Sequence, residues 1–368
     1  MKNRMVPAAF LFLLIACISL DAEDSGFQVS GSVRNETGYI GLRDDMAGAS
    51  RDWYSATSVD VRLSREGENT RFLASLWTEY DSADGDWELS LDESWFEWRP
   101  AAFLGARLGR APLRFGSCIA FNPANSLAAT DIFDSRSNEV GFDGFFLELH
   151  PLPQYSLAAH AAFLLPGDSV QEYDLSESSA HGRITFLAPG AGILGPVEIG
   201  VSSDFRRLGG TAPDGKIPMA GGVWLSMDIA GFVLGAEGTL RSAGYEALAA
   251  PGATVMPGGS DAAEYGWAVS LNRRAGDFFA VLETSYSKAG DGWKGFAQLS
   301  RSTEDTGQSL QAMIDFDALA ARTSLDAAWN LSDFLVVHGW GAWNYQPEKW
   351  NTELPADWAA GLALECFF

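Results

Sequence analysis

The chain has 368 residues, of which 47% are hydrophobic and 12% are Trp, Phe or Tyr, and it contains 39 glycines. This composition supports a packed fold and is typical of an all-β protein with many turns and much exposed aromatic surface. Acidic residues outnumber basic ones 48 to 25, for a net charge of −23, which excludes nucleic acid as a partner because phosphate binding requires positive charge.

The start of the chain has the pattern of a secretion signal that covers residues 1–22. Lys2 and Arg4 give it a positive start, and the apolar core that follows is too short to span a bilayer as a helix. Cleavage after Ala22 therefore predicts an exported mature chain, whose single domain occupies residues 23–368.

A second interpretation of the same region stays open. Residues Leu14–Cys17 also have the look of a lipoprotein box, in which Cys17 would be acylated. No other apolar stretch approaches the roughly 20 residues of a transmembrane helix. If the mature chain enters a membrane, strands must therefore cross it.

Alternating apolar and polar residues, the period of a β-strand, recur along the mature chain. The clearest runs are "TRFLASLWTEY" at 70–80, "GGVWLSMDIAG" at 221–231 and "EYGWAVSLNRR" at 264–274. Each has about ten residues, which is the length that a tilted strand needs to cross the hydrocarbon core. The run at 139–150 changes phase near Asp143–Gly144, and we expect a bulge there.

The connections between these runs alternate between tight turns and mostly longer loops. Turn-forming residues lie at Glu66–Asn69, Arg99–Pro100, Pro151–Pro153, Ala230–Gly231, Ala275–Asp277 and Asn330–Asp333. Polar loops lie between them, roughly at 43–53, 81–86, 111–138, 166–179, 206–218, 243–263, 288–292 and 346–356. Short turns on one rim and long loops on the other are typical of a bacterial outer-membrane barrel.

We therefore predict an all-β fold: a transmembrane antiparallel β-barrel of about 16–18 strands, with short periplasmic turns and long extracellular loops. Eighteen strands are expected near 27–42, 54–66, 70–80, 87–99, 102–110, 139–150, 154–165, 180–188, 194–205, 219–229, 231–242, 264–274, 276–288, 293–303, 307–317, 319–329, 333–345 and 357–368. Sixteen is the alternative, because the first run is long and 307–329 is ambiguous. The alternative of a soluble β-sandwich or solenoid is disfavoured, because the sequence offers no second apolar layer that could cover the aromatic faces.

If the apolar faces contact lipid, the alternate positions face the lumen of the barrel, and these positions are polar. They are Asp60, Arg62, Arg71, Glu79, Arg107, Glu148, His160, Glu198, Asp228, Glu237, Arg241, Glu283, Lys294, Asp315, Arg322 and Asp326. A charge facing the middle of the lipid would cost several kcal/mol, so this placement agrees with a barrel. A barrel of this size is too wide for side chains to fill, which predicts a water-filled channel.

The longest connection, Arg110–Ser137, is too apolar for a loop surrounded by water. We expect it to fold inward and form a constriction. The alternative is that it caps the barrel or packs on neighbouring loops. The candidate charges of the constriction and lumen are Arg110, Arg114, Asp131, Asp134 and Arg136 from the loop, with Arg71, Glu79 and Arg107 from the strands.

The segment "ARLGRAPLRFGSCIAFNPANSL" resembles the strand and inward loop of several large families of outer-membrane porins. The matching residues are Gly109, Arg110, Gly116, Asn122 and Pro123, while Phe115 stands where those families usually have Trp. The resemblance covers about 22 residues. It implies a porin-like channel in the bacterial cell outer membrane, through which small hydrophilic solutes diffuse passively.

The C-terminal sequence "GLALECFF" resembles the signal by which outer-membrane barrels are recognised for insertion. Its pattern places Leu362, Leu364 and Phe368 on the lipid-facing side of a last strand that pairs with the first. The resemblance implies that the barrel-assembly machinery and outer-membrane lipids are partners of the chain. Phe368 is expected at the periplasmic membrane interface.

Acidic residues outnumber basic ones in the expected lumen and loops, which predicts a channel that prefers cations. The rival hypothesis is a structural or adhesin-like barrel whose loop blocks the lumen. An enzyme or a cofactor has little support: Gly167–Val170 resembles an esterase nucleophile block but lies among loop residues, and the four histidines lack metal-ligand spacing. The sequence leaves open the transported solute, the ion selectivity and whether the barrel forms a homotrimer.

Overall fold

The structure of the chain is a computed structural model, and it describes most of the predicted barrel. The described residues are 26–42, 53–81, 85, 87–113, 115–124, 141–152, 157–165, 178–206, 217–243, 245, 263–288, 292–317, 319–345 and 356–368. The expected signal at 1–22, with its cleavage after Ala22 or acylation at Cys17, lies outside them. Within the described part, no helix is long and apolar enough to cross a membrane.

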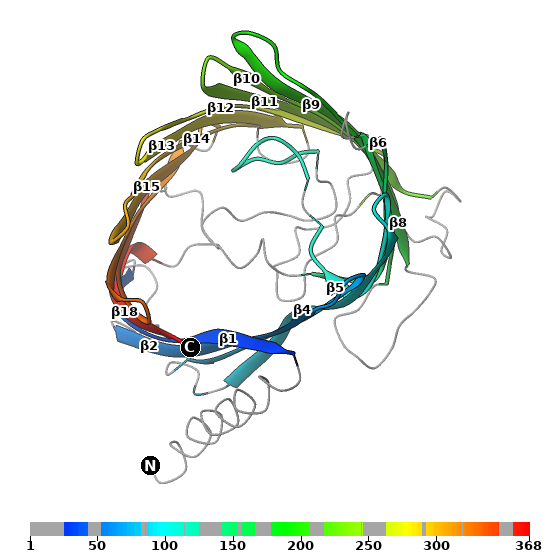
Figure 1. The fold of residues 1–368 in the computed structure, drawn as a ribbon. Helices are drawn as coiled ribbons and strands as arrows, with labels where there is room; N and C mark the ends of the chain where they lie inside the picture. Colours follow the sequence, from blue (N-terminus) through cyan, green and yellow to red (C-terminus); the bar gives the residue numbers. More distant parts are fainter. Residues whose placement is uncertain are drawn as a thin grey trace.

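The described chain is all-β and forms one sheet of 18 strands, as predicted. Viewed along the barrel axis, the strands form a ring (Figure 1). They are β1 Gln28–Leu42, β2 Trp53–Glu66, β3 Thr70–Asp81, β4 Trp87–Ala101, β5 Leu104–Ala111, β6 Phe142–Leu152, β7 Leu157–Leu164, β8 Ser179–Ala188, β9 Leu194–Phe205, β10 Met219–Ile229, β11 Phe232–Arg241, β12 Glu264–Ala275, β13 Phe278–Ser287, β14 Gly292–Ser302, β15 Thr306–Asp315, β16 Ala320–Ser332, β17 Leu335–Tyr345 and β18 Ala356–Phe367.

Each strand pairs with its neighbours in sequence, and the sheet closes because β1 also pairs with β18. In that seam Gly38 lies opposite Gly361, and Arg34 lies opposite Glu365. Closure gives each of the 18 described strands a partner on both sides, as β-structure in lipid requires. The ambiguous stretch at 307–329 contains the two strands β15 and β16, so 18 strands, and not 16, is the number in this fold.

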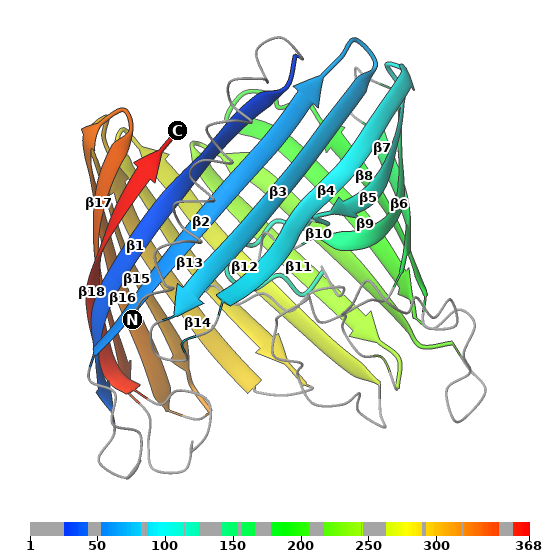
Figure 2. The same cartoon turned by 90° about the horizontal axis from the view of Figure 1, so that it is seen from below.

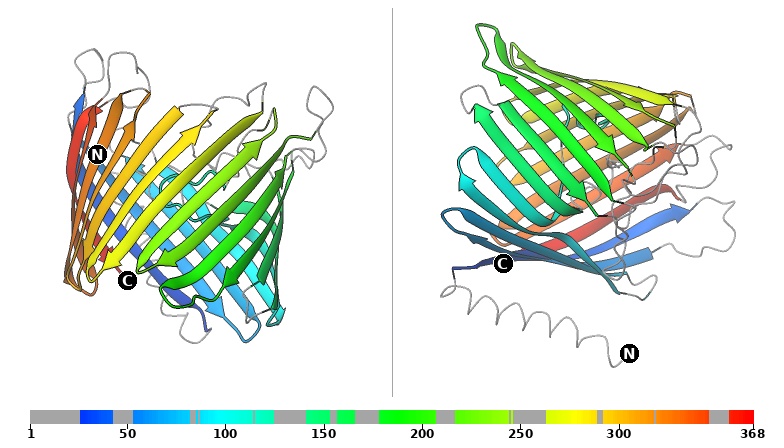
Figure 3. Two further views of the ribbon diagram at one scale, coloured as in Figure 1. Left: turned by 90° about the horizontal axis from the view of Figure 1, so that it is seen from above. Right: turned by 90° about the vertical axis from the view of Figure 1, so that its right-hand side faces the viewer.

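The two rims of the barrel differ in the length of their connections. Ala230–Gly231 joins β10 to β11 with positive φ angles of 53° and 80°, which is the backbone of a tight hairpin turn. Residues 276–277 and 333–334 make equally short links between the strands that flank them. The C-terminus lies on this short-turn rim, and the strand ends that the longer connections join lie on the other rim (Figures 2 and 3).

The pairing registers place the sixteen polar positions predicted for the lumen on one face of the sheet. The opposite face carries large apolar side chains that the chain itself leaves exposed. Among them are Leu108, Phe163, Ile184, Val223, Leu282, Leu299, Leu325 and Leu362. Lipid would cover these side chains, as expected for an outward face.

Aromatic side chains mark both ends of the outward face. Near the long-loop rim, Tyr39 contacts Trp53 and stacks on Trp358, with ring centroids 5.4 and 5.1 Å apart. Near the short-turn rim, the exposed aromatic residues include Phe96, Trp98, Phe278, Trp329 and Phe368. Two such bands are typical of barrels that span a bilayer, because aromatic rings favour the membrane interfaces.

The bulge expected near Asp143–Gly144 is not present. The strand β6 pairs regularly with β5 from Phe142 to Leu149, and Gly144 and Phe146 face inward. The alternation looked broken because Phe142 and Phe146 are aromatic on the inward face, where they pack under an internal loop. Asp143 faces outward, where Arg110 neutralises it.

Candidate functional site

The segment that follows β5 lies inside the ring of strands. Its described part, 112–113 and 115–124, is visible in Figure 1 as a cyan segment that leaves β5 and runs through the interior. Phe115, Ala120 and Ala124 are buried. A loop between two strands is normally solvated because its backbone polar groups need partners. The wall of the barrel supplies those partners here.

Two buried glutamates on the far wall bind the backbone of this internal loop. Glu237 on β11 accepts hydrogen bonds from the amides of Ser117, of Cys118 at 2.5 Å and of Ala124 at 3.2 Å. The Glu237 residue is 5% exposed. Three amides around one carboxylate offset part of the cost of burying the charge, because hydrogen bonds to an ionised group are strong.

Glu283 on β13 does the same for the next three residues of the loop. Its carboxylate accepts the amides of Ile119 at 2.5 Å, Ala120 at 2.8 Å and Phe121 at 3.0 Å, and the residue is 2% exposed. Glu237 and Glu283 therefore fix the loop at successive points. The loop starts at β5 and is held by strands that lie well over a hundred residues later in the sequence.

Apolar packing holds the described part of the loop at two points. Near its start, Phe115 packs with Trp224 on β10 and Leu164 on β7. Further along, Ala120 packs with Val281 and Phe296 on β13 and β14. Phe296 is a lumenal position that the loop covers, which explains why a large apolar residue is tolerated on the inward face.

The residues that carry the sequence resemblance have identifiable structural roles in the loop. Gly116 has a φ of +110°, and a Cβ there would meet the Asn122 Oδ1 and Glu237 Oε1 atoms. Asn122 donates from Nδ2 to the carbonyl of Phe115 at 2.5 Å and so closes a small internal turn. A residue other than glycine at 116 is disfavoured both by backbone conformation and by space.

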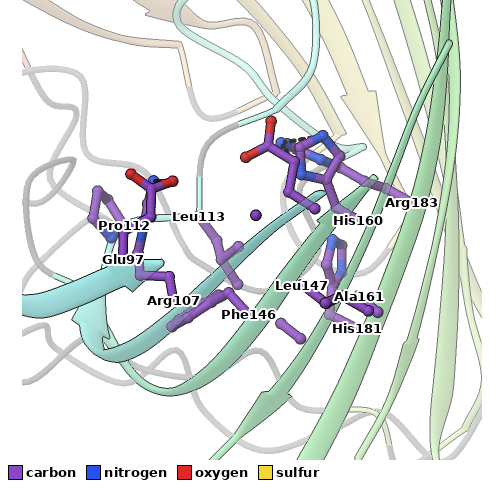
Figure 4. Close-up of a pocket in the computed structure, with 13 residues that line it drawn as sticks. Glu97, Arg107, Pro112, Leu113, Phe146, Leu147, His160, Ala161, His181 and Arg183 are labelled. Carbon is purple, nitrogen blue, oxygen red and sulfur yellow. Dashed lines mark hydrogen bonds and ion pairs between the residues drawn. The ribbon is translucent and has the colours of Figure 1, made fainter. Parts of the chain in front are cut away.

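A pocket lined by charged residues lies on the wall next to the start of the loop (Figure 4). Strands β4 to β8 form it, and Pro112 and Leu113 of the loop border it. Its charged and titratable residues are Glu97, Arg107, Glu148, His160, His181 and Arg183. Both signs of charge are therefore present within one hollow of the lumenal wall.

One group of charged residues at this pocket is a network around Glu97. Arg99 Nη2 lies 2.9 Å and Arg107 Nη2 lies 3.5 Å from Glu97 Oε1, and the Glu97 side chain is 3% exposed. Arg107 also stacks over Trp95, with its guanidinium carbon 4.4 Å from the ring centroid. Stacking and pairing together hold the Arg107 guanidinium in place on the wall.

A second group of pocket residues consists of His160, Arg183 and His181. Arg183 Nη2 lies 3.3 Å from the His160 ring nitrogens, and its guanidinium lies over the ring of Phe115. His181 Nδ1 is 2.5 Å from Asp204, and both side chains are fully buried. Phe115 of the loop lies against His181, with centroids 4.9 Å apart, so the loop and the charged wall are in direct contact.

The predicted strand charges are all on the lumenal face, at different heights. Arg107 lines the pocket described above. Glu79 lies near the long-loop end of β3, opposite Ser58 and Glu88. Arg71 lies near the short-turn end of β3 and pairs with Glu66 at 2.5 Å, with about half of its side chain exposed.

Arg110 is not lumenal, contrary to the expectation. It lies on the outward face of β5 with Leu108, and it binds Asp143 on β6 at 2.6 and 2.9 Å and the carbonyl of Leu91 at 2.9 Å. Arg107 and Arg110 are three residues apart in one strand, so their side chains must point to opposite faces. The ion pair with Asp143 makes an outward Arg tolerable.

The other loop candidates, Arg114, Asp131, Asp134 and Arg136, lie outside the described residues, as does Gly167–Val170. Sequence reasoning placed Glu237 and Glu283 in the lumen but missed their role as acceptors for the loop. The sequence signal was present, since an isolated Glu in the middle of an otherwise small or apolar inward face must find a buried partner. Among the described residues, no group of three or more His, Cys, Asp or Glu could hold a metal ion.

The thiol of Cys118 provides a test of how firmly the loop is held. Cys118 is buried, and burial together with Glu237 and Glu283 raises the pKa of its thiol above the ordinary value, so the reactive thiolate is scarce at neutral pH. We expect slow maleimide labelling at pH 7, with little acceleration up to pH 9. The measurement uses the chain from residue 23 with Cys366→Ser, so that Cys118 is the one thiol.

The loop anchors should control this reactivity. Glu283→Gln removes one of the two carboxylate acceptors and the negative charge, and we expect labelling of Cys118 to become about tenfold faster. Denatured protein gives the reference rate for a free thiol. Labelling of the native protein at the denatured rate would contradict an anchored loop.

The arrangement described above is that of a transmembrane β-barrel: a closed antiparallel barrel with an apolar outer face, a polar inner face and a loop held inside. Comparison with solved structures identifies this fold as that of bacterial outer-membrane porins. A mutant of the Rh. blastica porin has a TM-score of 0.51 and 11% identity, over 93% of this chain and all of that one. The Salmonella typhi OmpF complex with daunomycin has a TM-score of 0.51 and 10% identity, over 94% and 99%.

Identity at this level establishes the fold alone. No family model matches the sequence, and no curated protein matches it either. The function of the chain has to be inferred from its own residues.

Proposed function

We propose that the chain is a channel of the bacterial outer membrane through which small hydrophilic solutes diffuse passively, and that its internal loop forms the constriction. The observation that carries this proposal is the fixing of residues 117–124 inside the ring by Glu237 and Glu283. A loop that served only as an external cap would not need acceptors on the inner wall. Because the barrel has 18 strands, a single loop leaves water-filled space beside it.

The surroundings of the barrel follow from the same proposal. The exposed apolar outer face and its two aromatic bands fit outer-membrane lipids. Export by the signal at 1–22 and insertion by the barrel-assembly machinery would bring the chain there. Catalysis is not part of the proposed function.

Conductance in a planar bilayer tests the proposal. Purified chain should give discrete current steps in salt solution, with a reversal potential that shows cation preference under a salt gradient. The cause is the acidic lumen, in which carboxylates outnumber basic groups at the predicted positions. Protein that inserts without conducting would support the structural or adhesin-like barrel with a blocked lumen.

A matched pair of arginine variants tests where selectivity is set. Arg107→Gln removes a positive charge next to the loop, so we expect the cation-to-anion permeability ratio to rise roughly twofold. Arg71→Gln removes one at the solvated rim, where salt screens it, and should change the ratio much less. Equal effects of the two substitutions would place the selectivity region elsewhere.

A further inference from the structure

A platform of two aromatic rings lies on the inward face at the seam where the barrel closes. Trp340 on β17 lies opposite Gly361 on β18, Gly361 lies opposite Gly38 on β1, and Gly38 lies opposite Tyr54 on β2. One row of the wall therefore has an aromatic residue at each end and two glycines between them. The ring centroids of Tyr54 and Trp340 are 6.2 Å apart, at an interplanar angle of 39°.

The two glycines allow both rings to lie along the wall. A Cβ on Gly38 would come within 2.5 to 2.8 Å of the Tyr54 ring and hydroxyl, and one on Gly361 would come within 2.8 to 2.9 Å of the Trp340 ring. Each ring thus covers the glycine of the neighbouring strand. Glycine weakens a strand interior, so a pair of them here is explained by the close approach of the rings. Each ring therefore packs on the wall, and both side chains, on the inward face, are partly exposed.

Hydrogen-bonding groups border the platform on its short-turn side. The Tyr54 hydroxyl donates to Glu36 Oε1 at 2.6 Å, and Glu36 Oε2 is 2.7 Å from Arg34 Nη2. His338 Nε2 lies 3.0 Å from Glu365 Oε2. These side chains are 17 to 33% exposed, so they remain accessible from the lumen. The carboxylates of Glu36 and Glu365 already lie next to nitrogens of Arg34 and His338. A charged group of a solute would therefore gain little from binding to them.

We propose that this platform binds the sugar rings of a carbohydrate solute, which specifies the substrate class and rests on the proposed channel function. A pyranose ring has a face of C–H groups, which packs on the electron-rich face of an aromatic ring, and hydroxyls around its edge. The hydroxyls need both donors and acceptors, and the guanidinium, carboxylate and imidazole groups next to the rings provide both. An anionic solute is repelled by the electron-rich faces of the rings, and an apolar one leaves the polar border unpaired.

The test is the block of single-channel current by sugars added to a reconstituted channel. Glucose, maltose and cellobiose are the probes, and we expect at least one disaccharide to reduce the current with a saturating concentration dependence. Trp340→Ala should raise the half-blocking concentration about tenfold, which is the size of one aromatic contact. Trp340→Phe keeps a ring on Gly361 and should have a smaller effect.

Trp358→Ala is the matched control, because Trp358 lies on the outward face of β18 and is 44% exposed there. It should conduct and be blocked like the wild type. If Trp340→Ala gives no inserted channels, Trp340→Leu fills the same space without an aromatic face and is expected to show the same loss of block.

Different outcomes identify which proposal has failed. A channel that conducts but is blocked by no sugar, or is blocked equally after Trp340→Ala, overturns the sugar platform and leaves the channel intact. Block by indole without block by sugars overturns it in favour of an aromatic ligand. Protein without conductance contradicts the channel itself, and titration calorimetry of sugar into the detergent-solubilised barrel then decides on the platform.

Discussion

Replacement of both loop acceptors, in the variant Glu237→Ala/Glu283→Ala, is expected to release residues 117–124 from the wall of the barrel. Each carboxylate accepts three backbone amides of the loop. A hydrogen bond to a charged group contributes about 1.5–3 kcal/mol net, so the loss of several leaves the anchored position with little advantage over a detached one. We expect hydrogen exchange of these amides to accelerate at least about a hundredfold.

The same variant should change the current through the channel. A detached loop samples many positions in the lumen, so single-channel current should become noisy and its mean should shift, whereas the wild type should be quiet. Because the loop is attached at β5 and packs through Phe115 on Trp224 and Leu164, its first residues should remain protected from exchange. Faster exchange restricted to 117–124 is therefore the expected pattern.

Glu198→Ala is the control for this experiment. Glu198 is also a lumenal glutamate, but its carboxylate accepts from the Trp224 indole at 2.8 Å and binds none of the loop amides between 115 and 124. It removes one carboxylate from the lumen, against two in the double variant, and should leave exchange in the loop unchanged. If exchange of 117–124 is as slow in the double variant as in the wild type, the two glutamates do not hold the loop.

Much of the barrel follows from local sequence. The alternation of apolar and polar residues is a property of each strand by itself, and tight turns such as Ala230–Gly231 are local too. The two-residue period of a strand also decides on which face of the sheet each side chain lies. That rule places Arg110 on the face opposite Arg107, so its assignment to the constriction, made because it begins the long connection, conflicted with the sequence's own periodicity.

The parts that sequence could not provide depend on contacts between distant strands. Glu283 binds amides of residues 119–121, which lie 162 to 164 positions earlier, and no local pattern encodes that pairing. The platform of Tyr54 and Trp340 likewise exists because closure brings β17, β18, β1 and β2 side by side. In the sequence, a lumenal aromatic residue such as Trp340 looks like an interruption of the polar face. Only the strand pairing shows that Gly361 lies beside it and leaves room for its ring.

The last residue of the chain is a structural part of the barrel seam. The Phe368 amide donates to the Gly31 carbonyl at 3.1 Å, and the Gly31 amide donates to the Phe368 carbonyl at 3.1 Å. Leu362, Leu364 and Phe368 are exposed on the outward face, and Phe368 belongs to the aromatic band near the short-turn rim. The residue therefore completes the pairing of β18 with β1 and also ends the pattern proposed as an assembly signal.

Deletion of Phe368 is expected to lower the amount of barrel in the outer membrane at least several-fold, through loss of both the seam contacts and the proposed recognition by the barrel-assembly machinery. The channels that do assemble should have normal conductance, because the residue lies outside the lumen. Phe368→Ala keeps the two backbone hydrogen bonds and loses the ring, so it separates the two causes. If Phe368→Ala is as poorly assembled as the deletion, the ring is what assembly requires. Normal outer-membrane levels of the deletion variant would refute an assembly role for the C-terminal residue. In that case, the stability of the purified deletion variant, refolded into detergent, shows how much the seam contacts alone contribute.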